Sequence, residues 1–182
     1  MLVGKVVRSP FAHAKIISIN KEAALALPGV HAVLTADDLK PLGLHWMPTL
    51  AGDVCAVLAD EKVSFQYQEV AFVIADNRYI AVDAADLVEV ENEELPVVVD
   101  PHHAMDADAA IVRDDLVGKD EAGGGARKHN NHIFNWNVGD KDATDRAFES
   151  ADVTVKQDMI NQRVHACPLE TCGCVASFDK VK

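Results

Sequence analysis

Residues 70–75, Val-Ala-Phe-Val-Ile-Ala, are a continuous apolar run of strand length. Such a run offers no polar face to water, so the strand belongs inside a sheet. After a polar turn, residues 79–87 place Ile80, Ala84 and Leu87 on one face at helical spacing. The segment therefore predicts an interior strand followed by an amphipathic helix.

The rest of the N-terminal half predicts strands and short helices in no strict alternation. Asn20 can cap a helix that runs to Leu27, because its side-chain oxygen accepts an N–H of the first turn, and Pro28-Gly29 ends that helix. Thr35 or Asp37 can open a one-turn helix. Mixed elements of this kind predict the α+β fold class. The further elements expected are strands 2–9, 14–19, 30–35 and 88–99, the last interrupted at Pro96, and the one-turn helix 37–39.

A second unit is expected beyond residues 100–132, the weakest stretch for regular structure. We predict a first domain over residues 1–117, a linker over 118–131 and a second unit over 132–182. Both ends of the sequence are expected to be cut, because strands lie close to them without a lead-in or a cap. The second unit is expected to contain strand 133–138, a helix from Gly139-Asp140 to Ser150 that buries Ala143, Ala147, Phe148 and Ala151, and strands 153–162 and 174–178.

The amino-acid composition argues against several classes of protein. A formal net charge of −12 argues against nucleic acid as a partner, because binding to phosphates needs clustered Lys and Arg. No apolar run approaches the roughly 20 residues that cross a bilayer, and the N-terminus lacks the layout of a secretion signal. The expected compartment is therefore the cytoplasm. Four cysteines are too few and too unevenly spaced for a disulfide scaffold, which favours free thiols.

The cysteines near the C-terminus are the first candidate for a metal site. Cys167, Cys172 and Cys174 with His165 offer the thiolate and imidazole ligands that suit zinc or copper. Their C-x4-C-x-C spacing fits neither a zinc nor a ferredoxin pattern, and Gly173 gives no turn for chelation. We therefore predict no metal site here, and expect buried or partly buried free thiols.

Other polar motifs also favour a structural interpretation. The run Gly123-Gly124-Gly125-Ala126-Arg127-Lys128 lacks the Gly-Lys-Ser/Thr ending of a phosphate-binding loop, which favours a flexible linker. His102-His103, and His129 with His132, are expected to face solvent, because two imidazoles rarely bind a metal without a third ligand. Glu170 is expected to form a structural hydrogen bond or ion pair rather than to act in catalysis.

Residues 41–53 show no period, and their two prolines and two glycines mark a loop. Trp46, Met47 and Phe65 lie in or near this loop. They either form a contact surface for another subunit or domain or fold back on the core. The sequence leaves both interpretations open.

Four segments carry a resemblance to a known family. Residues 8–16, Arg-Ser-Pro-Phe-Ala-His-Ala-Lys-Ile, and residues 27–39 resemble the opening of the a/b hammerhead domain of the xanthine dehydrogenase/aldehyde oxidase family. Residues 84–90, followed by residues 95–100, resemble the end of that domain. The family usually has an aromatic residue where this sequence has Asn92. The resemblance implies a hammerhead domain followed by the first elements of the molybdenum-cofactor-binding domain.

Narrower motifs resemble one branch of that family. Residues 67–71, Tyr-Gln-Glu-Val-Ala, stand where many relatives have Gly-Gln-Pro-Val-Ala. This form is similar to the carbon monoxide branch, as are the block 44–63, Asn131-His132-Ile133-Phe134 and Pro168-Leu169-Glu170-Thr171-Cys172. The resemblance implies a piece of a large subunit whose complete protein oxidises carbon monoxide with water to carbon dioxide and passes two electrons to an acceptor.

The resemblance also implies cofactors and partners for the complete protein. The cofactor would be molybdopterin cytosine dinucleotide with molybdenum, beside a copper ion on a cysteine sulfur, and these metals would supply the difficult chemistry. The partners would be an iron–sulfur small subunit and an FAD medium subunit, in a dimer of heterotrimers. Association with the inner face of the membrane is left open.

The catalytic motifs of this branch are not in the sequence. Its copper-binding loop, Ala-Tyr-Arg-Cys-Ser-Phe-Arg, is missing, as are its Gly-Gly-Gly-Phe-Gly segment and the Gly-Glu-Ser that supplies the catalytic glutamate. We therefore expect no catalytic residue and no metal ligand in this chain, assign no cofactor contact, and expect that it binds no cofactor alone. Two alternatives remain open. One is another molybdenum hydroxylase that acts on aldehydes or heterocycles, and the other is a stand-alone α+β interaction module without catalysis.

Overall fold

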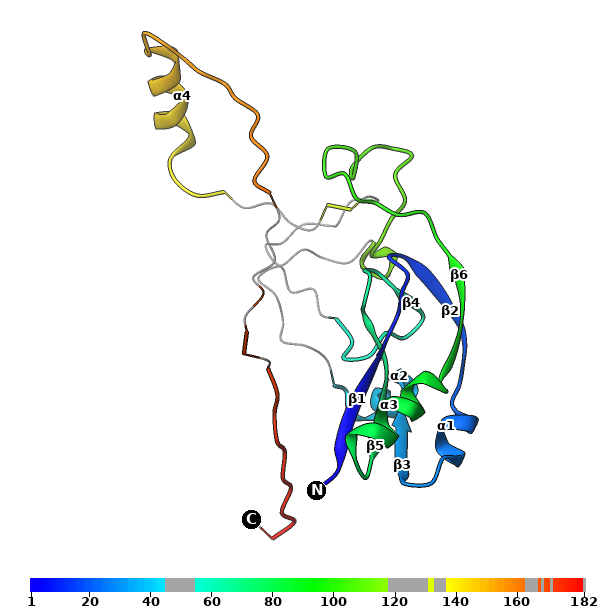
Figure 1. Ribbon diagram of the computed structural model, residues 1–182. Coiled ribbons are helices and arrows are strands. Elements are labelled where there is room, and N and C mark those ends of the chain that lie inside the picture. Colours follow the sequence, from blue (N-terminus) through cyan, green and yellow to red (C-terminus); the bar gives the residue numbers. More distant parts are fainter. Residues whose placement is uncertain are drawn as a thin grey trace. The chain divides into compact units, whose positions relative to one another are not determined.

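The computed structural model describes residues 1–44, 55–117, 131–132, 137–162, 167, 169–170 and 172–181. The chain separates into two compact units, Met1–Trp136 and Asn137–Lys182. All the strands that the structure describes belong to the first unit (Figure 1). Each helix in the described part of the chain is too short or too polar to cross a membrane.

Three antiparallel strands form the first sheet, in the order β1-β5-β3 (Figure 1). The predicted interior strand, β5 (Glu69–Ala75), lies between β1 (Val3–Arg8) and β3 (Val30–Leu34). Its side chains are buried or half-buried along its whole length, which confirms the prediction from the apolar run. Gly4 of β1 lies directly against the ring of Phe72, so a side chain at this position would displace the ring.

The second sheet has the order β4-β2-β6, with β2 (Ala14–Asn20) in the centre. Its outer strands are β4 (Lys62–Val63) and β6 (Glu89–Glu94). β4 was not predicted, because two residues are too few to show a period. β6 ends at Glu94, and residues 95–99 form no strand, so the predicted continuation beyond Pro96 was wrong. The glutamates of β6 line a sheet edge, where charged side chains discourage pairing with other chains.

Two helices cover the first sheet. α3 (Arg78–Asp86) packs on β1 and β5, and α1 (Glu22–Ala26) packs on β3 and α3. The core between them is built from small side chains, which allows the helices to approach the sheet closely. This cluster contains Ala24, Val33, Ala71, Val73, Ala84, Ala85 and Val88. A second cluster connects the second sheet to β5 and contains Ala14, Ala59, Val63 and Val70.

The buried face of α3 differs from the predicted one. Ala84 is buried as expected, together with Ala81 and Ala85. Leu87 was expected on the same face but is 39% exposed. The helix ends at Asp86, so Leu87 is its C-terminal cap residue and no longer follows the helical spacing.

Short polar side chains begin the helices near the positions that the sequence indicates. Asn77 Oδ1 accepts hydrogen bonds from the backbone N–H groups of Tyr79 and Ile80 at 3.0 and 3.1 Å, which starts α3. Thr35, one of the two predicted caps, starts α2 (Ala36–Leu39), which continues into the single turn η1 (Lys40–Leu42). Asn20 Oδ1 accepts from Glu22 N at 3.1 Å, although the cap of α1 is the next residue, Lys21.

The first unit ends in a long segment with one further turn, η2 (Asp114–Leu116). Beyond it, the second unit contains α4 (Lys141–Glu149), which starts as predicted, because Asp140 Oδ1 accepts a hydrogen bond from Ala143 N at 2.9 Å. The predicted burial of this helix was wrong. Phe148 is 60% exposed, and Ala143, Ala147 and Ala151 are also exposed, because no other described segment packs against that face.

The predicted strands 153–162 and 174–178 are also wrong for this structure. Both segments are extended and exposed, and they make no strand pairing within the described residues. Alternating apolar residues define a strand only where a neighbouring strand supplies hydrogen-bond partners. Most of the predicted strand 133–138 lies outside the described residues.

Candidate functional site

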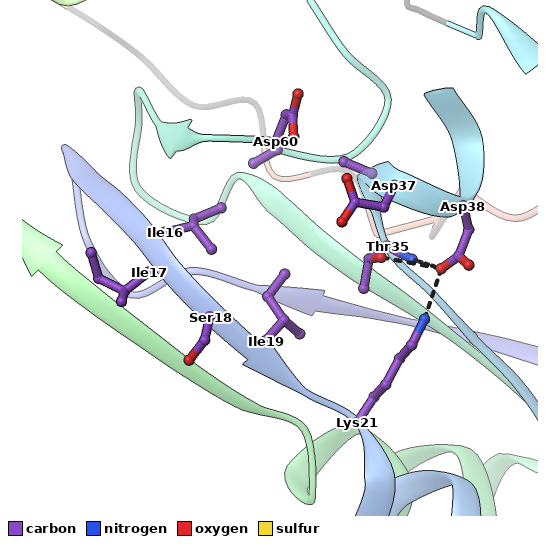
Figure 2. A pocket seen from close by; sticks show the side chains of 11 residues that line it. Ile16, Ile17, Ser18, Ile19, Lys21, Thr35, Asp37, Asp38 and Asp60 are labelled. Atoms are coloured by element: carbon purple, nitrogen blue, oxygen red, sulfur yellow. Dashed lines mark hydrogen bonds and ion pairs between the residues drawn. The ribbon is translucent and has the colours of Figure 1, made fainter. Parts of the chain in front are cut away.

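A groove of about 300 Å³ lies between β2 and α2 in the first unit. Figure 2 shows the isoleucines of β2 on one side and the residues of α2 on the other. The groove is therefore apolar along β2 and acidic along α2. It is lined by Ile16, Ile17, Ser18, Ile19, Lys21, Thr35, Ala36, Asp37, Asp38, Ala59 and Asp60.

Lysines neutralise the carboxylates of this groove. Lys21 Nζ lies 2.8 Å from Asp38 Oδ2 and also donates to Val33 O at 3.1 Å (Figure 2). The hydrogen bond from Lys21, followed by that from the backbone N–H of Thr35, holds the pKa of Asp38 below its ordinary value. Asp38 is thus kept ionised as part of the start of α2.

A second lysine connects the other two carboxylates. Lys40 Nζ lies 2.7 Å from Asp60 Oδ1 and 3.0 Å from Asp37 Oδ1. The hydrogen bond to Asp60, and then that to Asp37, raises the pKa of Lys40. Each carboxylate in the described lining is therefore already paired with a cation. None of them is poised as a general acid or base, and the groove carries no catalytic assignment.

The cysteines near the C-terminus do not form a metal site in the described part of the chain. Among the described residues, no group of three or more His, Cys, Asp or Glu side chains could hold a metal ion. Cys167, Cys172 and Cys174 are exposed, so the expectation of buried or partly buried thiols was wrong for them. His165 lies outside the described residues, and Cys55 is half-buried, with its sulfur 3.5 Å from Arg113 Nη1.

The predicted solvent-facing histidines divide into two groups. His102 and His103 are exposed as expected. His103 Nδ1 lies 2.9 Å from Asp106 Oδ2, and this hydrogen bond, with the charge of Asp100, raises the pKa of His103. His132 is half-buried, contrary to the prediction, because the adjacent Asn131 is held against residues 104–112. His129 lies outside the described residues.

The other residues that the sequence singled out do not form a site among the described residues. Glu170 is exposed, and no hydrogen bond or ion pair joins it to another described residue, so its expected structural contact stays a prediction. Phe65 is 52% exposed, which favours the contact-surface interpretation for this residue. Trp46, Met47 and residues 123–128 lie outside the described residues.

Tyr67 is a feature that reasoning from the sequence missed. Its φ of 66° lies in the left-handed region, which favours glycine. The turn is held by Arg8, whose Nη1 donates to Tyr67 O at 2.8 Å, and by Tyr67 N, which donates to Ser9 O at 2.9 Å. The available signal was the resemblance of residues 67–71 to a family motif that begins with glycine.

His13 is a buried polar residue that the sequence did not single out. It is 6% exposed, and its Nδ1 lies 2.7 Å from Pro96 O. A carbonyl oxygen can only accept, so Nδ1 donates, and Nε2 is left as a buried nitrogen without a hydrogen-bond partner among the described residues. The contact ties the start of β2 to the segment after β6.

Comparison with known proteins identifies two domain families. Residues 1–96 match the family model for the aldehyde oxidase and xanthine dehydrogenase a/b hammerhead domain, and residues 125–182 match the molybdopterin cofactor-binding domain. The hammerhead match covers more than half of the chain and agrees with the α+β fold and domain order that the sequence resemblance implied.

Individual relatives show the same similarity. The chain is 65% identical over all of its 182 residues to the carbon monoxide dehydrogenase large chain of Hydrogenophaga pseudoflava, and covers 23% of that protein. The chain is also similar to a structure of reconstituted CO dehydrogenase from Oligotropha carboxidovorans, with a TM-score of 0.78 and 63% sequence identity. The match covers 84% of this chain and 19% of the chain in that structure. A crystal structure of a Cu,Mo-CO dehydrogenase in the carbon monoxide-reduced state matches with a TM-score of 0.75 and 63% sequence identity. This match also covers 84% of this chain and 19% of the other chain.

Proposed function

The chain belongs to the aldehyde oxidase and xanthine dehydrogenase family, and from this we propose that it is part of the large subunit of an enzyme that oxidises carbon monoxide. The observation that supports the proposal is the 65% identity, over the full chain, to a carbon monoxide dehydrogenase large chain. The chain spans less than a quarter of that relative's length. The activity is therefore proposed for the complete protein.

The proposed reaction takes carbon monoxide and water to carbon dioxide, two protons and two electrons. The oxygen comes from water, and the electrons pass to an acceptor. We assign no catalytic residue to the described part of this chain. Its groove carboxylates are all paired, and the described cysteines near the C-terminus form no metal site.

A molybdenum cofactor is proposed for the complete protein, because residues 125–182 match the molybdopterin cofactor-binding domain. We propose a cytosine dinucleotide form of this cofactor from the sequence resemblance alone, and a copper ion beside molybdenum, which draws support from the similar Cu,Mo enzyme. The described residues of the second unit are exposed and gather no set of ligands. They do not by themselves fit this cofactor, so no step of the reaction is assigned to them.

Partner subunits belong to the same proposal. The similar protein is named as a large chain, which implies at least one other chain in its enzyme. We propose an iron–sulfur small subunit and an FAD medium subunit as the path for the two electrons, in a dimer of heterotrimers.

The proposal is tested by sequencing the gene beyond the codon of Lys182 and assaying the protein that it encodes. A frame that reaches Ala-Tyr-Arg-Cys-Ser-Phe-Arg, in a protein that reduces a dye with carbon monoxide as the electron donor, would support it. A frame with a different loop at that position, and activity on aldehydes or heterocycles only, would contradict it. Metal analysis of the purified enzyme tests the copper assignment separately, with one copper expected for each molybdenum.

A further inference from the structure

The side chain of Asn131 makes three hydrogen bonds to one loop of the first unit. Asn131 Oδ1 accepts from the backbone N–H of Val112 at 2.8 Å. Its Nδ2 donates to the carbonyl oxygens of Ala104 and Ala110, both at 2.8 Å. All three partners are backbone atoms, and all three contacts are part-buried.

An amide side chain is well suited to this position. It has two N–H donors and a carbonyl acceptor, and here both donors and the acceptor are used. No other common side chain of this size supplies both kinds of group. Residues 104–112 contain no helix or strand, and their other described backbone contacts are single turns, such as Ala109 N to Asp106 O at 3.1 Å. The amide of Asn131 therefore provides long-range hydrogen bonds that organise this loop.

These hydrogen bonds matter because Asn131 and its partners lie on either side of the boundary between the two matched domains. The loop lies after the hammerhead match, which ends at residue 96, whereas Asn131 lies inside the cofactor-binding match, which begins at residue 125. The bonds thus join the loop that follows the hammerhead match to a residue inside the cofactor-binding match. They place Asn131 with the first unit, although the sequence predicted a linker over residues 118–131.

We infer that Asn131 is a positioning residue that clasps residues 104–112 and thereby attaches the molybdopterin cofactor-binding segment to the first unit at residue 131. The significance of this clasp for the cofactor rests on the proposed function, whereas the clasp itself does not. A loop closed at a fixed point loses less conformational entropy on ordering than a free linker of the same length. The cofactor-binding segment therefore has a fixed point of attachment at residue 131.

Hydrogen exchange at the backbone amide of Val112 tests the inference on the 182-residue chain, without any cofactor or activity. This amide donates to Asn131 Oδ1, so it should be protected in the native chain. In Asn131→Ala the bond is lost, and exchange is expected to be about five- to tenfold faster, the effect of removing one such bond. Unchanged exchange at Val112 in this variant would overturn the inference.

Two further variants separate the clasp from a loss of folding. Asn131→Asp keeps the shape and the acceptor but places a carboxylate against two carbonyl oxygens, so it is expected to lose protection as Asn131→Ala does. Retained protection would show that the two donated bonds are not needed, and would also contradict the clasp. Asn137→Ala is the matched control, because Asn137 is exposed, and it should leave Val112 as protected as in the native chain. Amides of β5 should stay protected in all three variants, because this strand lies far from Asn131 in the sequence and is held by two neighbouring strands.

Discussion

At the scale of single residues, Tyr67 shows how a strained position can be held by its neighbours. A non-glycine residue in the left-handed region costs about 1–2 kcal/mol. Here Arg8 and Ser9 bond to its backbone, and Arg8 is further anchored by Glu69, whose Oε1 lies 2.5 Å from its Nη1. The ring itself is 62% exposed. The backbone of Tyr67, rather than its ring, therefore connects β1 to the start of β5.

Replacing Tyr67 with glycine is expected to stabilise the first unit. The gain from relieved strain exceeds the entropy that glycine adds to the unfolded chain, so the free energy of unfolding should rise by a few tenths to about 1 kcal/mol. Urea unfolding of Tyr67→Gly against the native chain measures the difference. Tyr67→Ala is the control, since it removes the ring but keeps the strain, and it should give no gain. Equal effects of the two variants would show that the ring matters and the strain does not.

Residues that act through their own chemistry could be predicted from the sequence, and those that act through distant partners could not. Thr35 was named as a possible helix start because of its residue type and position, and it caps α2. Nothing in the type of Tyr67 indicates positive φ, since that conformation is imposed by bonds to residues almost 60 positions away. The same holds for His13, whose partner, Pro96, is 83 residues distant.

At the scale of elements, the short helix α2 depends on one carboxylate. Asp38 Oδ2 accepts from Thr35 N at 2.8 Å and lies 2.8 Å from Lys21 Nζ. A helix of four residues is too short to be stable alone, so these contacts decide whether it forms. They also place α2 beside β2, along the groove of Figure 2.

The contribution of Asp38 is expected to depend on pH. Its pKa is lower in the folded protein than in the unfolded chain, so folding favours the ionised form. This stabilisation is fully present above the ordinary pKa of 3.8, and is lost as the pH falls through the lower, folded-state pKa. Asp38→Asn should therefore lower the free energy of unfolding at pH 7 by about 0.5 kcal/mol, as expected for a solvent-exposed pair, and the difference should vanish in acid.

Urea unfolding of Asp38→Asn and the native chain over a pH series measures this effect. The matched control is Asp37→Asn, on the same helix, because the side chain of Asp37 is 84% exposed and does not bond to Thr35. It should have a smaller effect at pH 7. A difference between Asp38→Asn and the native chain that stays constant with pH would contradict a role for the ionised carboxylate.

Sequence periodicity predicted which elements exist better than it predicted what they pack against. The runs that became β1, β2, β3, β5 and β6 were all recognised, but periodicity gives no information on pairing, and the position of β5 between β1 and β3 emerged only in the structure. The same limit explains the errors in the second unit. Val153 and Val155 alternate as in a strand, yet both are about 80% exposed, without a partner among the described residues.

At the scale of the whole molecule, the two units differ in how their apolar side chains are used. The first unit buries two clusters that connect both sheets with α1 and α3. In the second unit Phe148, Val153, Met159 and Phe178 are between 60% and 87% exposed. Burial of apolar surface is the main source of folding free energy, so the two units are expected to differ widely in stability.

This difference predicts where a protease cuts first. Trypsin should cleave at Lys156 well before it cleaves at Lys15, although both side chains are exposed, because Lys156 lies in an extended segment and Lys15 lies in the central strand of a sheet. Local opening at Lys156 requires no loss of sheet hydrogen bonds, whereas opening at Lys15 breaks pairings with both neighbours. A time course followed by mass spectrometry should show early loss of the C-terminal part and a persistent fragment that retains the strands described for the first unit. Cleavage at the two lysines at the same rate would mean that the second unit is protected as well as the first, and that its exposed apolar residues find partners in solution.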